Sequence, residues 1–127
     1  MDYWHRIRLA VGEGTLIIPG AAGAIVQDGK ILLVRHNGFQ KWQVPGGVQE
    51  VGEAIHQTAE REIREELGLD ICARHLIGVY SGPEWTLEYA DGSKTQQLTF
   101  FFLMAGPVAP IQIQESEIAA CSFLHRT

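Results

Sequence analysis

Three glutamates close together in the sequence, Glu62, Glu65 and Glu66, have the residue type and spacing of a divalent-cation site. They lie in residues 54–67, which contain no Gly or Pro and are rich in helix-forming residues, so this segment is predicted to be helical. Gly68 follows where a helix end favours a left-handed residue. Carboxylates crowded against a helix's buried edge repel one another and resist desolvation, and a bound cation removes both costs. Oxygen ligands of this charge suit Mg²⁺ or Mn²⁺.

The predicted helix has an apolar stripe and an opposite face that is expected to be solvated. Glu62 and Glu66 point close to the stripe, and Glu65 lies on its flank. Arg61, four residues before Glu65, can hydrogen-bond that carboxylate and orient it. For the helix alone, the alternative is an acidic surface helix with ion pairs four residues apart. The stripe contains Ile55, Ala59, Ile63 and Leu67, and the solvated face contains Gln57, Glu60 and Arg64.

The segment before the helix favours the metal site over this alternative. Pro45, Gly46 and Gly47 interrupt a strand predicted at residues 42–44 and let the backbone approach a ligand closely. Glu53 precedes the helix, where a carboxylate interacts favourably with the helix dipole. Pro-Gly-Gly alone would fit an ordinary turn, so only its connection to the helix indicates a functional role.

Residues 47–69 fit the pattern G-x5-E-x7-R-E-U-x-E-E-x-G-U, in which U is a bulky aliphatic residue. This stretch resembles the signature box of the Nudix hydrolases, which cleave nucleoside diphosphates linked to another group. The resemblance implies that Glu62, Glu65 and Glu66 bind the metal, that Glu62 is the best candidate for the general base, and that Arg61 and Glu53 support them. The pattern residues are Gly47, Glu53, Arg61, Glu62, Ile63, Glu65, Glu66, Gly68 and Leu69.

The resemblance implies two further metal ligands outside the pattern residues. One is the backbone carbonyl of Gly46, which precedes the first glycine of the box. The other is a glutamate six residues before an aromatic residue on the last strand, which corresponds to Glu117 before Phe123. Glu115 is the alternative, and either residue has an ordinary solvated loop acid as its other interpretation.

The rest of the chain is predicted to consist mainly of strands and turns. A hairpin is expected within residues 15–38, with its turn at Asp28-Gly29, and a second hairpin tip at Asp91-Gly92. The resemblance covers residues 21–124 and implies a Nudix-type α/β/α sandwich, an α/β fold with a mixed sheet and one central helix. A single domain of residues 1–127 is expected. Further strands are predicted at residues 71–81, 98–104 and 118–124.

One departure from the family concerns a second helix, which usually follows the last strand. The sequence ends at Thr127, so this helix is expected to be missing at the C-terminus. An uncovered sheet face would expose apolar side chains of residues 98–104 and 118–124 and favour self-association, most simply as a homodimer. Alternatively, residues 3–11 cover the face within one chain.

Composition narrows the range of partners and compartments. A net charge of −5 argues against duplex binding, so no stable nucleic-acid partner is expected, and no segment is apolar and long enough to span a membrane. Cys72 and Cys121 have neither metal-site spacing nor a disulfide framework and are interpreted as buried thiols of a cytoplasmic protein. His36 is expected to be a surface or boundary residue rather than a ligand.

Three functions are compatible with these features. The first is a metal-dependent hydrolase of a small-molecule nucleotide: a canonical or oxidised nucleoside triphosphate, ADP-ribose, a nucleotide sugar or a dinucleoside polyphosphate. The second is a non-catalytic Nudix-like nucleotide-sensing domain, although such regulators often lose box glutamates and none is lost here. The third is an isopentenyl-diphosphate isomerase-like enzyme, for which neither cysteine has a recognisable catalytic setting. Candidates to stack on a nucleobase are Trp42, Tyr80, Trp85 and Tyr89.

Overall fold

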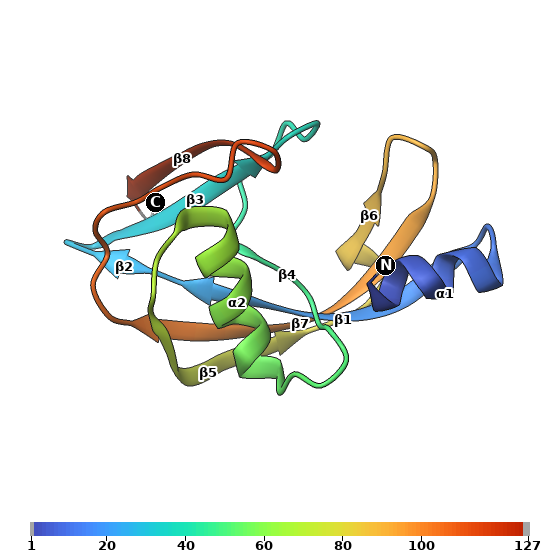
Figure 1. The fold of residues 1–127 in the computed structure, drawn as a ribbon, viewed down its shortest axis with the longest axis horizontal. Helices are drawn as coiled ribbons and strands as arrows, with labels where there is room; N and C mark the ends of the chain where they lie inside the picture. The colour runs from blue at the N-terminus through green and yellow to red at the C-terminus, as the bar shows by residue number, and fades with distance from the viewer. Residues whose placement is uncertain (1, 126–127) are drawn as a thin grey trace.

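The computed structural model describes residues 2–125, and its larger sheet is mixed and five-stranded (Figure 1). The strand order is β4-β1-β7-β5, and β6 pairs with β7. The central strands β1 and β7 are parallel, whereas the other pairings are antiparallel. The predicted mixed sheet is therefore confirmed. The strands are β1 Thr15–Ala24, β4 Gly46–Val48, β5 Cys72–Tyr80, β6 Thr86–Glu88 and β7 Lys94–Ala105.

A second, three-stranded sheet has the order β2-β3-β8, with β2 Val26–Gln27, β3 Lys30–His36 and β8 Ile118–His125. The turn between β2 and β3 contains Asp28 and Gly29, with φ angles of 54° and 75°. Positive φ at both central residues is the requirement of a type I′ turn, so the predicted hairpin turn is confirmed. The expected first strand of that hairpin is divided into two strands: β1 belongs to the larger sheet, and only the short β2 pairs with β3.

The central helix α2 spans Ile55–Leu67, as predicted. At its start, Gln57 Oε1 accepts a hydrogen bond from the backbone N–H of Ala54 at 2.8 Å. At its end, Gly68 adopts a left-handed conformation, and its N–H donates to the carbonyl of Arg64 at 2.9 Å. Both ends thus satisfy backbone groups that a helix leaves unpaired.

The apolar stripe of α2 packs into the core between the two sheets (Figure 1). Ala59, Ile63 and Leu67 are completely buried, as the predicted helix phase requires. The opposite face departs from expectation at Glu60, which is half-buried because its Oε2 accepts a hydrogen bond from Ala73 N at 2.8 Å. The core also contains Ala21, Ile25, Leu32, Val34, Leu69, Ile71, Phe102, Met104 and Ile118.

The second α-helix of the described residues, α1 (Tyr3–Val11), lies at the opposite end of the molecule from the second sheet (Figure 1). None of its residues is buried. Arg8 attaches it to the larger sheet by donating to the carbonyls of Gly12, Gly14 and Lys94. The alternative in which residues 3–11 cover an apolar sheet face is therefore wrong. No helix within residues 2–125 has the length and apolarity needed to cross a membrane.

The exposed apolar side chains lie on a different strand from the one expected. Within residues 98–104 and 118–124, Phe102, Met104 and Ile118 are buried in the core and Leu124 is the exposed large apolar residue, so the predicted patch there is wrong. The edge strand β5 instead exposes Leu76, Ile77, Val79 and Tyr80. The difference arises because β7 is central in its sheet and β8 contributes Ile118 to the core, whereas β5 pairs on one side only.

Candidate active site

Arg61 joins three of the predicted site carboxylates. Its guanidinium donates to both oxygens of Glu53, to Glu62 Oε1 at 2.9 Å and to Glu65 Oε2 at 3.1 Å. It also donates to the carbonyl of Val48 on β4 at 2.9 Å. Burial opposes the charged form, but the hydrogen bond to Glu53 and the charge of Glu62 raise the pKa of Arg61. The predicted contact with Glu65 is present, and the sequence had not indicated that Glu53 and Glu62 share the same arginine.

Glu53 is held firmly in its ionised form at the start of this network. Its Oε1 accepts hydrogen bonds from the backbone N–H of Glu50 at 2.9 Å and from Thr58 Oγ1 at 3.0 Å. Burial acts to raise the pKa of Glu53, but the hydrogen bonds from Arg61, Glu50 and Thr58 lower it below its ordinary value. Glu53 therefore acts as an anchor for Arg61, and Arg61 in turn orients the two carboxylates further along the helix.

Glu62 lies against β4, at a point where only a glycine fits. A Cβ added to Gly47 would lie 2.6 and 2.7 Å from the two carboxylate oxygens of Glu62. Burial, and then the nearby charge of Glu66, raise the pKa of Glu62 to about 8. The missing side chain of Gly47 thus lets the sheet approach a carboxylate that has been partly removed from water.

Glu66 is the most deeply buried carboxylate, with no exposed side-chain surface. Its Oε1 lies 3.2 Å from His36 Nε2, within ion-pair distance, although neither oxygen has a hydrogen-bond partner among the described residues. Burial raises the pKa of Glu66, and the proximity of Glu66 raises the pKa of His36. His36 is half-buried, as expected of a boundary residue, but it lies beside Glu66, which the sequence had not indicated. Its position follows from pairing of β3 with β8, which no local sequence pattern indicates.

The segment of residues 111–117 brings Glu117 close to this pair. Gln112 N and Gln114 N donate to the last-turn carbonyls of Leu67 and Glu66, at 2.8 and 2.9 Å. The carbonyl of Glu117 accepts from Asn37 N at 2.7 Å, and the charge of Glu117 acts on both His36 and Glu66. Glu117 therefore lies beside the carboxylate cluster.

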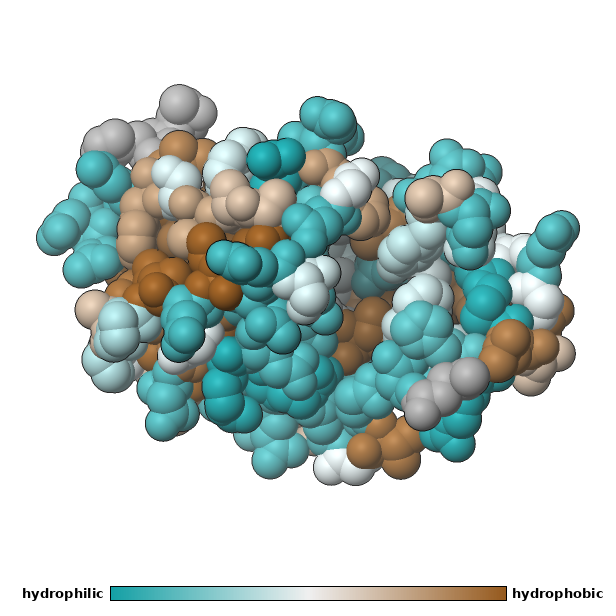
Figure 2. All heavy atoms as spheres, turned by 45° about the horizontal axis from the view of Figure 1, so that its top comes forward, coloured by the Kyte–Doolittle hydropathy of each residue, from teal (hydrophilic) through white to brown (hydrophobic). Residues whose placement is uncertain are grey.

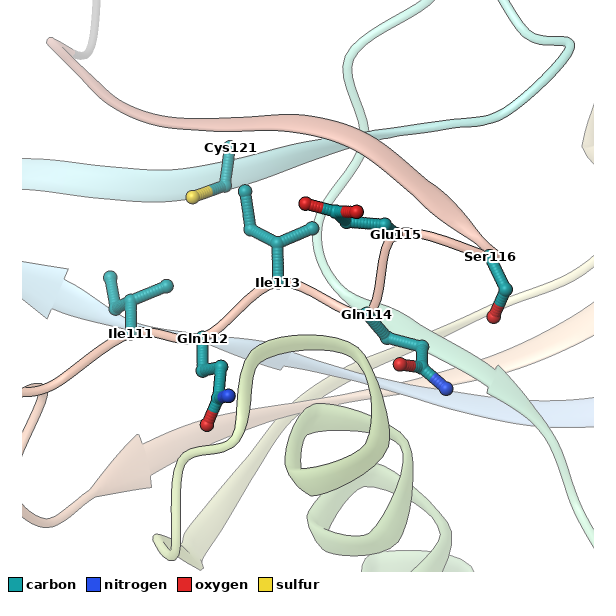
Figure 3. Close-up of a pocket in the computed structure, with 7 residues that line it drawn as sticks. All are labelled: Ile111, Gln112, Ile113, Gln114, Glu115, Ser116 and Cys121. Carbon is teal, nitrogen blue, oxygen red and sulfur yellow. The ribbon is translucent and has the colours of Figure 1, made fainter.

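The other side of this segment offers no comparable site. In Figure 3, Ile111 and Ile113 point toward Cys121 on β8, whereas Gln112 and Gln114 point toward α2. The hollow beside Cys121 has Glu115 as its only charged lining residue. Without a cation or a basic side chain, this hollow has no group that would bind a diphosphate. Glu115, the predicted alternative to Glu117 as a metal ligand, therefore lines this hollow and not the surface next to the carboxylate cluster.

The carboxylate cluster fits a divalent cation in its chemistry. Within residues 2–125, no three His, Cys, Asp or Glu side chains are already arranged around a common point as metal ligands. Arg61 accounts for part of this, since it holds Glu53, Glu62 and Glu65 by hydrogen bonds. The two partnerless oxygens of Glu66, beside Glu62, are the observation that favours a cation, because a buried carboxylate is costly without a positive partner. Mg²⁺ commonly combines a few carboxylates with water and substrate phosphates.

A cavity of about 480 Å³ adjoins these carboxylates across β4. Gly47 lines the cavity and also contacts Glu62, so this single residue lies between the cavity and the carboxylate cluster. Figure 2 shows a hollow in the middle of the molecule with apolar atoms at its floor. The floor is formed by β1 and β7, one wall by residues 41–47, and the other wall by residues 84–87.

Two of the four predicted stacking residues line this cavity. Trp42 is 41% exposed and has no aromatic neighbour among the described residues. Trp85 is supported by Tyr80, with ring centroids 5.3 Å apart, and by Phe101. Tyr89 lies elsewhere, stacked on Trp4 of α1 at 5.5 Å. Trp42 and Trp85 are therefore the aromatic residues positioned to meet a ligand.

Comparison with known proteins gives several matches to these features. Over 65 residues the chain is 43% identical to an ADP-ribose pyrophosphatase of Methanocaldococcus jannaschii, which covers 49% of this chain and 38% of that protein. It is 29% identical over 104 residues to a MutT-like protein of Streptomyces ambofaciens, which covers 81% of this chain and 60% of that protein. A solved structure of a UDP-X diphosphatase aligns with a TM-score of 0.66 and 26% identity, covering 96% of this chain and 57% of the other. The chain thus spans less than two thirds of each of these proteins.

The family assignment rests on a match over most of the chain. The sequence model of the NUDIX domain matches residues 18–126, which include most of β1, the box helix α2 and β8. The match agrees with the box pattern in residues 47–69 and with the mixed sheet around one central helix. This chain belongs to the NUDIX family.

Proposed function

We propose that this chain is a metal-dependent hydrolase that cleaves a phosphoanhydride bond in a nucleoside diphosphate linked to another group. The observation that supports this most strongly is Glu66, a buried carboxylate next to Glu62 in the box helix, to which no group within residues 2–125 donates a hydrogen bond. The names of the relatives, ADP-ribose pyrophosphatase and UDP-X diphosphatase, support a nucleotide substrate.

In this proposal, Mg²⁺ or Mn²⁺ is bound by Glu62, Glu65, Glu66 and the carbonyl of Gly46, with Glu117 completing the set. Gly46 begins the edge strand β4, where every other backbone carbonyl faces away from the neighbouring strand. When bound, the cation neutralises diphosphate charge and lowers the pKa of water. The cation would add positive charge beside the carboxylates, next to Arg61 at Glu62 and His36 at Glu66.

The remaining box residues hold the carboxylates in place. Arg61 donates to Glu62 Oε1, which leaves Oε2 free to accept a proton from the attacking water. Glu62 is therefore the candidate general base, and Arg61 and Glu53 are positioning residues. Geometry supports this choice over Glu65, which is half exposed, because a base that is partly desolvated binds a proton more strongly.

Neither alternative function has an observation that favours it. Neither Cys72, exposed on β5, nor Cys121 on β8 lines the cavity next to the carboxylates, as the isomerase alternative would require of a catalytic cysteine. A nucleotide-sensing domain would retain the cavity and lack turnover, so activity is the measurement that separates it from a hydrolase.

The test is hydrolysis of a nucleotide panel with product analysis. We expect turnover of at least one nucleotide in Mg²⁺ or Mn²⁺, loss of turnover in EDTA, and recovery when the cation is restored. Cleavage should release a nucleoside monophosphate together with a phosphorylated remainder or pyrophosphate. Full turnover in chelator would contradict the metal assignment, and absence of turnover on the whole panel would contradict the hydrolase.

A further inference from the structure

The cavity beside the carboxylates contains an amide that is hydrogen-bonded to a buried threonine. Gln97 of β7 lines the cavity floor, and its Nε2 donates to Thr95 Oγ1 at 2.7 Å. A Cβ added to Gly20 would lie 3.5 Å from Gln97 Oε1, so this oxygen lies over the glycine on β1. No residue of the described chain donates a hydrogen bond to Oε1. Gln97 thus presents a free acceptor on the cavity floor.

The hydrogen-bond partner of Gln97 is itself held rigidly. Thr95 is 1% exposed, and its hydroxyl also lies 3.4 Å from the hydroxyl of Tyr89. The ring of Tyr89 is enclosed by Trp4 of α1, at 5.5 Å, and by Phe39 of the loop after β3, at 6.3 Å between ring centroids. The packing of these rings therefore holds the Tyr89 hydroxyl next to the threonine that binds the amide.

The cavity around this acceptor is suited to a nucleobase. Trp42 and Trp85 provide flat apolar surfaces at its walls, and bases stack well on such side chains. The volume of about 480 Å³ is within the range of small-molecule sites. Gly47 connects the cavity to Glu62, so a ligand with its base here would have its phosphates next to the carboxylates.

We propose that Gln97 determines base specificity by accepting a hydrogen bond at Oε1 from an N–H group on the edge of the substrate's base. Thr95 and Tyr89 are positioning residues that keep this oxygen turned toward the ligand. This inference rests on the proposed function, since it assumes a nucleotide substrate. A buried or partly buried acceptor discriminates strongly against a ligand without the matching donor, because the acceptor is then left unpaired.

The test compares pairs of nucleotides that differ in one N–H donor on the base. Suitable pairs are ATP with purine riboside triphosphate, GTP with ITP, CTP with the 2-pyrimidinone analogue, and UTP with 3-methyl-UTP. We expect the protein to prefer the donor-bearing member of at least one pair by roughly tenfold or more in kcat/KM. Gln97→Met should reduce this ratio to about one, because it keeps the length of the side chain and removes the acceptor. Gln96→Met, on the opposite face of the same strand, should keep the wild-type ratio.

A second variant tests the positioning residues, and it keeps the inference testable if Gln97→Met does not fold. Thr95→Val keeps the side-chain shape and removes the hydroxyl, so it should lower the preference within the pair while the far-ultraviolet circular dichroism is unchanged. A merely structural role would affect both members of the pair equally and leave their ratio unchanged. If Gln97→Met or Thr95→Val retains the wild-type ratio, the corresponding role is wrong.

Binding distinguishes failure of this inference from failure of the proposed function. The same pairs, as α,β-methylene analogues, are titrated calorimetrically in Mg²⁺. Preferential binding that depends on Gln97, without turnover of any nucleotide, would support the specificity role and contradict the hydrolase. Turnover without any preference in the four pairs, or absence of nucleotide binding, would overturn the role of Gln97.

Discussion

At the scale of single residues, the site depends on carboxylates that the fold has partly removed from water. Glu62 and Glu66 both have raised pKa values, chiefly because they are buried. The pKa of Glu53, which lies eight residues before Arg61, is instead lowered, because Arg61, Glu50 and Thr58 donate hydrogen bonds to its carboxylate. Glutamates of one short segment therefore differ in pKa, because their hydrogen-bond partners and their burial differ.

Glu66→Gln tests whether the buried carboxylate binds the cation. The substitution keeps the side-chain size and removes the negative charge, and loss of a metal ligand commonly costs several kcal/mol of transition-state stabilisation. We expect kcat to fall at least about a hundredfold with the fold intact. Glu13→Gln is the matched control, since Glu13 is exposed after α1 and should be nearly silent. The Glu60 side chain is unsuitable as a control because it binds Ala73 N. Equal kcat values for the two variants would mean that Glu66 is not a ligand.

The raised pKa of Glu62 predicts how stability depends on pH without the cation. Its pKa rises from 4.5 in the unfolded chain to about 8 in the folded protein. Between these values the folded state keeps a proton that the unfolded chain has lost, so the free energy of unfolding should fall as pH rises. Glu66 shifts in the same direction, whereas the lowered pKa of Glu53 contributes stability above pH 4.5 that is lost as the pH falls below that value.

Urea unfolding in EDTA at about pH 5 and about pH 8 measures this effect. Stability should be lower at the higher pH, and Mg²⁺ should reduce the difference, because it favours the ionised carboxylates. Glu62→Gln should flatten the dependence. A wild-type free energy of unfolding that is constant across this range would contradict the assignment of a raised pKa.

At the scale of elements, the site is formed where α2 approaches β4. Gly47 of β4 provides room for Glu62, and Arg61 of α2 bridges the two elements by donating to the carbonyl of Val48. The segment of residues 111–117 then adds Glu117 by hydrogen-bonding to the last turn of α2. The geometry of the carboxylate cluster is thus set by two consecutive elements, β4 and α2, and by one segment that is far from both in sequence.

Gly47→Ala tests the close approach of β4 to α2. The added Cβ would lie 2.6 Å from Glu62 Oε1, so the carboxylate must move. We expect a large loss of kcat/KM, with a small change in secondary structure measured by circular dichroism. Gly78→Ala on β5 is the control, because the atoms nearest to its added Cβ belong to the exposed ring of Tyr80, away from Glu62. Activity of Gly47→Ala at the level of this control would show that Glu62 needs no such precise position.

At the scale of the whole molecule, the exposed edge strand β5 determines how copies would meet. Leu76, Ile77, Val79 and Tyr80 are each between 43% and 53% exposed. The pairing of β5 with β7 has two register shifts, and such irregularities disfavour strand addition at an edge. Contact through the apolar side chains is therefore the expected mode of association.

We expect the protein to self-associate through β5, most simply as a two-fold dimer. Light scattering at several concentrations measures the oligomeric state. Ile77→Lys should shift the equilibrium toward the monomer, whereas Val26→Lys, at a similarly exposed apolar position on β2, should leave it unchanged. A wild-type monomer at every concentration would rule out the dimer.

The sequence by itself determined the box helix, its boundaries and its chemical character. Helix propensity, the left-handed Gly68 and the apolar stripe are local properties, so the limits and phase of α2 could be predicted from residues 54–68. The turn at Asp28-Gly29 and the contact between Arg61 and Glu65 follow from equally short-range rules.

Only the tertiary structure decided what depends on pairing between distant segments. It brought His36 and Glu117 to Glu66, gave Glu60 a backbone partner on β5, and oriented Gln97 through Thr95 and Tyr89. It also assigned the exposed apolar surface to β5 instead of β7 and β8. These outcomes depend on strand order and on which edge is left unpaired, and strand order is set by the global packing of the core. Local sequence patterns specify which residues form an element, whereas the environment of each side chain is specified by its neighbours in space.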